Sequence, residues 1–167
     1  VHRPPGRLEF RKIAVFIIGG RPMALVKDIL ADKGHDVVTI ERTASVTQAA
    51  QLMTERRIGA LIVVHDEKVV GIISERDLLS RVLGARLDPE KTPVGAVMTW
   101  PIAWCRLETS LEECREVMTK MRIRHLPVVE AGKLAGIISS RDVLAFEITD
   151  NLRTIEYLHD YIQGKYR

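Results

Sequence analysis

Two short polar segments carry the side chains of this sequence that could best hold a small molecule. Each follows an apolar run and has the pattern Ser-x-Arg-Asp, first as Ser74, Arg76 and Asp77 and then as Ser139, Arg141 and Asp142. Where a buried strand ends and a helix begins, unpaired backbone N–H groups and the serine hydroxyl form a seat for a phosphate, and the arginine adds positive charge. The aspartate can accept hydrogen bonds from two neighbouring ribose hydroxyls. The pattern therefore predicts a ribose-phosphate site that occurs twice.

The same spacing also has an interpretation that needs no ligand. Ser-x-x-Asp is typical of a capping box, in which the serine and the acidic side chain satisfy the first backbone N–H groups of a helix. From the motif alone both interpretations stay open.

The two segments belong to a longer repeat with an offset of 65 residues. Residues 45–79 and 110–144 are identical at 16 of 35 positions without a gap. Identity at this level is too high for two unrelated segments that merely share an apolar pattern, so the chain is an internal duplication.

Each repeat changes its hydrophobic period in the same order. In the first, residues 37–40 predict a strand, Ser45 caps a helix, and residues 61–64 and 69–73 predict a hairpin before a helix that starts after Ser74. The second repeat has the corresponding strand 102–105, helix 110–121, hairpin strands 126–129 and 134–138, and a helix after Ser139. The predicted fold is α/β of the α+β type, with the order β-α-β-β-α twice and the two units packed about a pseudo-twofold axis.

The sequence divides into five parts on this basis. They are an N-terminal extension (1–22), the first repeat (23–83), a linker with two Pro residues (84–93), the second repeat (94–150) and a helical tail (151–167). Apolar residues at spacings of three and four predict an amphipathic helix over 143–163, through Ile148, Leu152, Ile155, Leu158 and Ile162. Its apolar stripe either packs on its own unit or contacts a second copy of the chain, and both alternatives are open.

Charge and composition argue against several classes of partner. Residues 1–22 contain five basic residues and one acidic residue, which leaves 20 basic and 21 acidic residues in the rest of the chain. A balanced body with only 8 aromatic residues offers no phosphate-tracking stripe or stacking platform, so we expect no nucleic-acid partner. The longest apolar run, 13–18, is too short to span a bilayer, and we expect no membrane association.

The remaining reactive side chains form no catalytic arrangement. Cys105 and Cys114 lack a Cys-x-x-Cys spacing and occupy apolar positions of the repeat, which predicts buried thiols in a reducing, cytoplasmic compartment. The five histidines have no metal-ligand spacing, and no Gly-rich phosphate loop or nucleophile motif is present. We therefore predict a non-enzyme with no metal.

Four segments together resemble the CBS-domain pair, also called a Bateman module, and in particular its small stand-alone members. They are 57–61 (Arg-Ile-Gly-Ala-Leu), 74–78 (Ser-Glu-Arg-Asp-Leu), 124–128 (Arg-His-Leu-Pro-Val) and 161–164 (Tyr-Ile-Gln-Gly), and the resemblance covers about residues 24–150. It implies a regulatory protein, commonly dimeric, whose clefts between the repeats bind AMP, ADP, ATP, S-adenosylmethionine or NAD(H). Within this family pattern the binding interpretation of Ser-x-x-Asp is favoured over the capping box.

The resemblance also implies that each cleft joins the Ser/Asp motif of one repeat to the first strands of the other. The first cleft would then consist of Ile72, Ser74, Arg76, Asp77, Ile102, Ala103, Ile123, Arg124 and His125. The second would consist of Ile137, Ser139, Arg141, Asp142, Val37, Val38, Ile58, Gly59 and Ala60. Because Arg124 and His125 replace Gly59 and Ala60, we expect two more cations in the first cleft and tighter nucleotide binding at Asp77 than at Asp142.

The predicted function is that of a sensor. An adenosine nucleotide, AMP first among the candidates, binds between the repeats of a homodimer and changes its interaction with a regulated protein that the sequence does not identify. One alternative is a redox regulator that senses NAD(H) or binds a thioredoxin-type partner, and another is a protein-interaction scaffold with no ligand.

Overall fold

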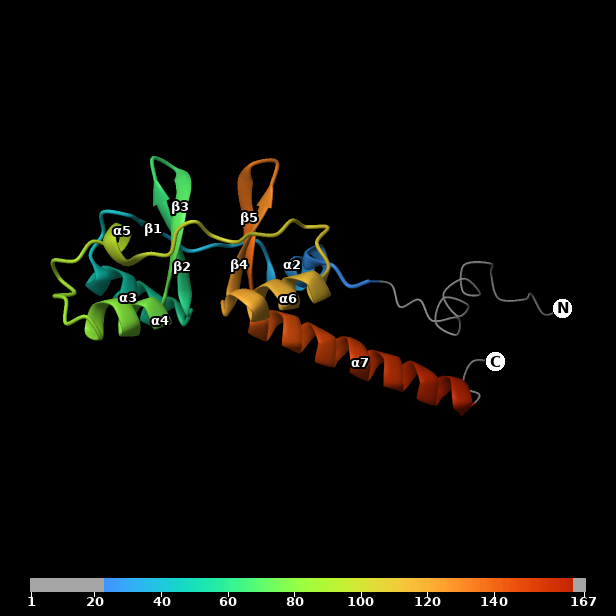
Figure 1. The fold of residues 1–167 in the computed structure, drawn as a ribbon. Helices are drawn as coiled ribbons and strands as arrows, with labels where there is room; N and C mark the ends of the chain where they lie inside the picture. The colour runs from blue at the N-terminus through green and yellow to red at the C-terminus, as the bar shows by residue number, and fades with distance from the viewer. Residues whose placement is uncertain (1–22, 164–167) are drawn as a thin grey trace.

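The computed structural model describes residues 23–163, which form two α/β units side by side with one long helix leading away from them (Figure 1). The predicted extension 1–22 and the last four residues of the tail lie outside the described residues. In each unit the longer helices lie toward one end of the hairpin, and the hairpin tips point the other way (Figure 1). The predicted α/β fold of two tandem repeats is confirmed.

The first unit follows the predicted order. It contains β1 (Thr39–Glu41), α3 (Val46–Arg56), β2 (Ala60–His65), β3 (Lys68–Ser74) and the short α4 (Glu75–Asp77), which continues as the π-helix η1 (Leu78–Leu83). β1 runs parallel to β2, and β2 pairs antiparallel with β3. A capping box fixes the start of α3, because the Ser45 backbone N–H donates to Gln48 Oε1 at 2.9 Å and the Gln48 N–H donates to Ser45 Oγ at 3.2 Å.

The second unit lacks one predicted strand. It contains α6 (Leu111–Met121), β4 (His125–Glu130), β5 (Lys133–Ser139) and α7 (Ser140–Ile162), but residues 102–105 form only an isolated bridge from Cys105 to Val128. In the first unit the Ile62 N–H donates to Val38 O at 3.3 Å, and the repeat equivalent of Ile62 is Pro127. Proline has no N–H to donate, so the corresponding ladder bond cannot form and the strand prediction for 102–105 is wrong.

The hydrophobic core of each unit includes a short helix that belongs to the other repeat in sequence. α2 (Val26–Lys33), which precedes the first repeat's strands, packs Val26, Ile29 and Leu30 into the second unit's core against β5 and α7. α5 (Val94–Val97), which follows the linker, packs into the first unit's core. Neither helix was predicted from the sequence, and the division into 23–83, 84–93, 94–150 and 151–167 stays a prediction.

Glycines at equivalent positions allow these exchanged helices to approach the sheets. A Cβ on Gly136 of β5 would lie 2.8 Å from Leu30 Cδ1, and a Cβ on Gly71 of β3 would lie 2.6 Å from Met98 Sδ at the end of α5. Real Cβ atoms do not approach other atoms so closely, so a larger residue at either position would push the helix away from the sheet.

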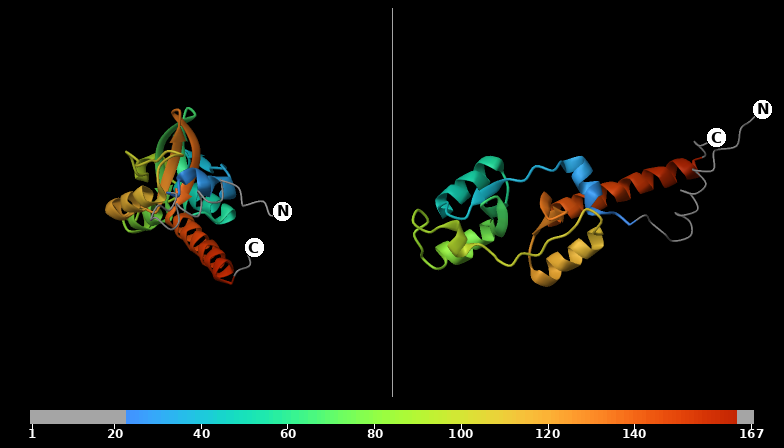
Figure 2. Two further views of the ribbon diagram at one scale, coloured as in Figure 1. Left: turned by 90° about the vertical axis from the view of Figure 1, so that its right-hand side faces the viewer. Right: turned by 90° about the horizontal axis from the view of Figure 1, so that it is seen from above.

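The predicted amphipathic helix is part of α7, which begins at Ser140 and runs for 23 residues. Its apolar stripe is exposed, with relative residue accessibilities of 51% for Ile148, 57% for Leu152, 61% for Ile155 and 81% for Ile162. Figure 2 shows the distal part of α7 leading away from both units. Packing of this stripe on its own unit is therefore contradicted. In the part of the chain that the structure covers, no helix combines the length and apolarity needed to cross a bilayer.

Candidate ligand-binding clefts

The first cleft is a cavity of about 290 Å³ around Asp77, lined by both units. All nine residues predicted for it line this cavity: Ile72, Ser74, Arg76, Asp77, Ile102, Ala103, Ile123, Arg124 and His125. Six further residues line it that were not predicted from the sequence: Arg81, Thr99, Pro101, Met121, Arg122 and Pro127. The repeat offset would have pointed to Arg122, because it is the equivalent of Arg57 beside the predicted Ile58.

The second cleft is a larger cavity of about 430 Å³ around Asp142. It also collects all nine residues predicted for it: Ile137, Ser139, Arg141, Asp142, Val37, Val38, Ile58, Gly59 and Ala60. Lys33, Asp36, Arg57, Glu75 and Ser140 join them, as do Arg124 and His125, which were predicted for the first cleft only. The structure thus brings the predicted residues together, and their role in binding stays a prediction.

Both motif aspartates make the contacts of a helix cap. Asp77 Oδ2 accepts from the Ser74 N–H at 2.9 Å and from Ser74 Oγ at 2.7 Å. Asp142 Oδ2 accepts from the Ser139 N–H at 2.7 Å and from Ser139 Oγ at 2.8 Å. The capping interpretation therefore holds for one oxygen of each carboxylate, and any ligand would have to use the other.

The second oxygens of the two carboxylates differ. Asp77 Oδ1 accepts from Thr99 Oγ1 at 3.3 Å and lies 3.4 Å from the Nε of Arg81. Asp142 Oδ1 has no hydrogen-bond partner among residues 23–163. A ribose could thus reach Asp142 without displacing a protein contact to Oδ1, whereas at Asp77 it would compete with Arg81 and Thr99.

Lys33 gives the second cleft a feature that the sequence analysis did not predict. As the last residue of α2, its Nζ lies 2.7 Å from Asp142 Oδ2 and donates to the Ile137 carbonyl at 3.1 Å. Its repeat equivalent is Met98, so the first cleft has no corresponding lysine. The spacing of Val26, Ile29 and Leu30 was the available sequence signal, since it indicates the helix that carries Lys33.

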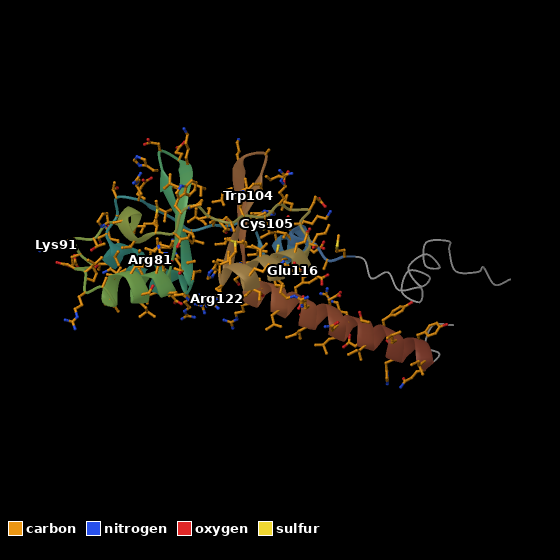
Figure 3. The ribbon with its side chains drawn as sticks, viewed as in Figure 1. Arg81, Lys91, Trp104, Cys105, Glu116 and Arg122 are labelled. Carbon is orange, nitrogen blue, oxygen red and sulfur yellow. The ribbon has the colours of Figure 1, made fainter. Side chains whose placement is uncertain are left out.

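Arginines from both units surround the clefts. Arg76 Nη1 donates to the carbonyl of Arg122 at 2.8 Å and so links the first unit to the end of α6. Arg122 ends α6 in the left-handed conformation at φ 54°, as Arg57 ends α3 at φ 53°. Figure 3 shows Arg122 at the junction of the two units and Arg81 within the first. The guanidinium groups of Arg57, Arg122, Arg124 and Arg141 have no ion pair with another described residue, which leaves them available to an anion.

His125 does not add the cation that the sequence analysis expected. Its burial lowers the pKa of the imidazole, and the positive charges of Arg124 and Lys33 lower it further, while Asp142 and Glu75 oppose this only in part. The imidazole is therefore neutral near pH 7. Because Arg124 and His125 also line both cavities, the predicted preference for Asp77 loses its original basis and stays a prediction.

The Lys33–Asp142 pair can be tested through the carboxyl group itself. Burial opposes ionisation of Asp142, but hydrogen bonds from Lys33 and Ser139 outweigh it and lower the pKa. A lowered folded-state pKa stabilises the fold above the aspartate's unfolded pKa, and this contribution is lost as pH falls through the folded value. We expect Lys33→Met, which copies the equivalent residue Met98 of the second repeat, to move the Asp142 pKa upward in a carboxyl NMR titration. An unchanged Asp142 titration midpoint would contradict the pair.

Among residues 23–163, no group of three or more histidine, cysteine, aspartate or glutamate side chains is arranged to hold a metal ion. Cys105 and Cys114 are free and buried, as their repeat positions predicted.

Comparisons with known proteins agree on one family. The sequence model described as the CBS domain matches residues 26–84 and 94–148. The mitochondrial CBS domain-containing protein CBSX3 of Arabidopsis thaliana is 29% identical over 150 residues, which covers 84% of this chain and 73% of the relative. The crystal structure of the CBS domain NE2398 superposes with a TM-score of 0.73 at 40% identity and covers 75% of this chain and 98% of that one. The CBS-domain pair of protein MJ0100, in complex with 5′-methylthioadenosine and S-adenosyl-L-methionine, has a TM-score of 0.68 at 26% identity and covers 77% of this chain and 99% of that one.

Proposed function

This chain belongs to the CBS-domain family, and on that premise we propose that it is a non-catalytic sensor that binds an adenosine nucleotide, AMP first among the candidates, in its two clefts. CBS-domain pairs are regulatory modules that often bind adenosine compounds. One observation carries the proposal: each cavity joins a Ser/Asp motif of one unit to backbone and apolar residues of the other. Such a cavity can hold a purine between apolar side chains while the motif contacts the ribose and phosphate.

A ligand in either cleft would act on the arrangement of the two units. Both cavities are lined by residues from each unit, and Arg76 already links the first unit to the end of α6. For occupancy to work as a signal, the nucleotide must bind one arrangement more tightly than the other, because equal affinity shifts no population. A regulated protein would then recognise the favoured arrangement.

The experiment is a thermal unfolding series with AMP, ADP, ATP, NADH and S-adenosylmethionine. A ligand that binds only the folded chain and is present at a concentration one hundred times its Kd stabilises the fold by about 2.7 kcal/mol. This corresponds to a rise in Tm of roughly 5 to 10 °C. We expect this rise with an adenosine nucleotide and expect it to disappear in Asp77→Asn/Asp142→Asn. Glu55→Gln, which changes an exposed carboxylate on α3 outside both cavities, should keep it. No rise with any compound, after removal of bound nucleotide, would contradict the proposal, and a rise with NADH alone would favour the redox alternative.

A second candidate, a scaffold that binds a partner without a nucleotide, is favoured by one surface. Trp100 and Trp104 are 62% and 50% exposed in the segment that connects the two units. The Arg106 guanidinium lies 5.6 Å from the Trp104 ring centroid, and Trp104 (labelled in Figure 3) precedes Cys105, which bridges to Val128 of β4. Exposed tryptophan and arginine side chains are frequent anchors of protein interfaces. If no nucleotide stabilises the chain, this surface is where a partner should bind.

We also propose that the chain is a homodimer that pairs through its helical side. Leu79 and Leu83 of the first unit are 63% and 60% exposed, and their repeat equivalents Leu144 and Ile148 are 57% and 51% exposed. The two units thus present the same apolar residues, which α7 extends toward its end. A surface built from equivalent halves suits a twofold contact with a second copy. The cytoplasm is the proposed compartment, because both cysteines are free.

A further inference from the structure

The two clefts differ in charge although they come from one repeated sequence. The first is lined by four arginines (Arg76, Arg81, Arg122, Arg124) and by one carboxylate, Asp77, which lies against Arg81. The second is lined by four cations (Lys33, Arg57, Arg124, Arg141) and by three carboxylates (Asp36, Glu75, Asp142). Of these three only Asp142 is ion-paired within the described chain, through Lys33. Counting these side chains, the net charge is +3 in the first cleft (4 − 1) and +1 in the second (4 − 3), and the second has two carboxylates, Asp36 and Glu75, without an ion-pair partner in the described chain.

Glu75 is the unpaired carboxylate that lies on the wall between the units. It follows Ser74 in the first unit's motif, yet it lines the second cleft and not the first. A Cβ on Gly59 would lie 3.3 Å from Glu75 Oε2 and 3.6 Å from His125 Cε1, so the carboxylate and the imidazole meet over this glycine. The neutral imidazole cannot compensate the negative charge. The glycine therefore makes room for a carboxylate inside the cavity.

The sequence repeats show why this charge is one-sided. The repeat equivalent of Glu75 is Ser140, which has no charge, and the equivalent of Gly59 is Arg124. The first cleft has no counterpart of Glu75, because Ser140 is uncharged and lines the second cavity, while Arg124 lines both. The difference between Glu75 and Ser140 in the repeats therefore leaves this carboxylate on one side only.

From this we infer that Glu75 makes the second cleft prefer a nucleoside monophosphate, whereas the first cleft, with no unpaired carboxylate, accepts the di- and triphosphates. This inference rests on the proposed nucleotide binding. Each added phosphate brings negative charge into the cavity, and Glu75 and Asp36 repel it. Salt screens charges over a Debye length of roughly 8 Å at physiological ionic strength. A cavity of about 430 Å³ has a mean width of about this size, so phosphates anywhere in it lie close enough to Glu75 and Asp36 to be repelled.

Calorimetric titrations with AMP and ATP test the inference, one cleft at a time and without Mg²⁺, so that ATP keeps its full charge. Asp77→Asn leaves the second cleft intact, and Asp142→Asn leaves the first. In Asp77→Asn we expect AMP to bind roughly tenfold more tightly than ATP, and we expect added Glu75→Gln to reduce this ratio about fivefold. In Asp142→Asn the same Glu75→Gln change should alter the ratio less than about twofold. Glu55→Gln, a matched loss of an exposed carboxylate outside the clefts, should alter neither ratio.

A second measurement covers the case that an aspartate variant does not fold. Backbone amide NMR titrations of the unmodified chain and of Glu75→Gln can follow Ala103 for the first cleft and Gly59 for the second, because each lines only one cavity. Equal AMP-to-ATP ratios at both residues, or a ratio at Gly59 that Glu75→Gln does not change, would overturn the inference while nucleotide binding stands. Absence of binding by either compound at both residues would overturn the proposed function itself.

Discussion

Replacing Leu30 by alanine should lower the free energy of unfolding by about 2 to 5 kcal/mol, the usual cost of such a truncation in a well-packed core. Leu30 is only 1% exposed and belongs to the second unit's core, although it precedes the first strand in sequence. Gly136 of β5, which packs against the Leu30 methyl groups, has no side chain that could fill the space left by the truncation. Chemical denaturation, with hydrogen exchange to locate the change, measures both parts of the expectation.

The distribution of the effect is as informative as its size. Hydrogen exchange should accelerate first in α6, β4 and β5, which share the core with Leu30, and less in β2 and β3. Asp32→Ala changes an exposed residue of the same helix and should cost far less than Leu30→Ala. If Leu30→Ala cost less than about 1 kcal/mol, or loosened the first unit more than the second, the placement of α2 would be wrong.

Placing glutamates in the exposed stripe of α7 should break the proposed dimer. Ile148→Glu/Leu152→Glu would bring two carboxylates into a contact that should otherwise bury two large aliphatic side chains, each worth about 1.5 to 3 kcal/mol. We expect the dimer dissociation constant to rise at least about a hundredfold, which light scattering coupled to size-exclusion chromatography would show as a monomer at micromolar concentration.

The control for this result changes charge on the same helix without touching the stripe. Glu156→Gln should leave the dimer intact, and circular dichroism should show equal helix content in all three proteins. A wild-type chain that is monomeric at high concentration, or a double variant that stays dimeric, would contradict pairing through α7. Pairing through another surface would then need a separate explanation for the exposed stripe.

The parts of the fold that could be predicted from sequence are those with local signals. Ser45 and Ser110 cap the starts of helices, and polar turns between apolar runs indicate the hairpins. The 65-residue offset then gives the same assignment to the equivalent residues of the other repeat. The same offset, combined with the family resemblance, named eighteen cleft residues that the structure gathers around two cavities. Local signals repeated twice are more reliable than either copy alone.

The failures come from non-local packing. The strand at 102–105 depended on a hydrogen bond that Pro127, 22 or more positions later, cannot donate. Lys33 reached the second cleft only because α2 crosses to the other unit, and no spacing in the sequence indicates that crossing. The expected charge on His125 failed because burial and the neighbouring Arg124 and Lys33 act on its pKa, and these depend on the folded environment.

The exchange of α2 and α5 has a consequence for how such a chain could arise. Each repeat carries a helix that completes the core of the other, so a protein with only one repeat could complete its core only by trading helices with a second molecule. Fusion of two gene copies would turn that intermolecular trade into an intramolecular one, with the partner always present at the high effective concentration that a linker provides. Recombination that moved one repeat alone into another gene would leave that repeat's core without α2 or α5. The two repeats together are therefore the smallest segment that keeps both cores complete.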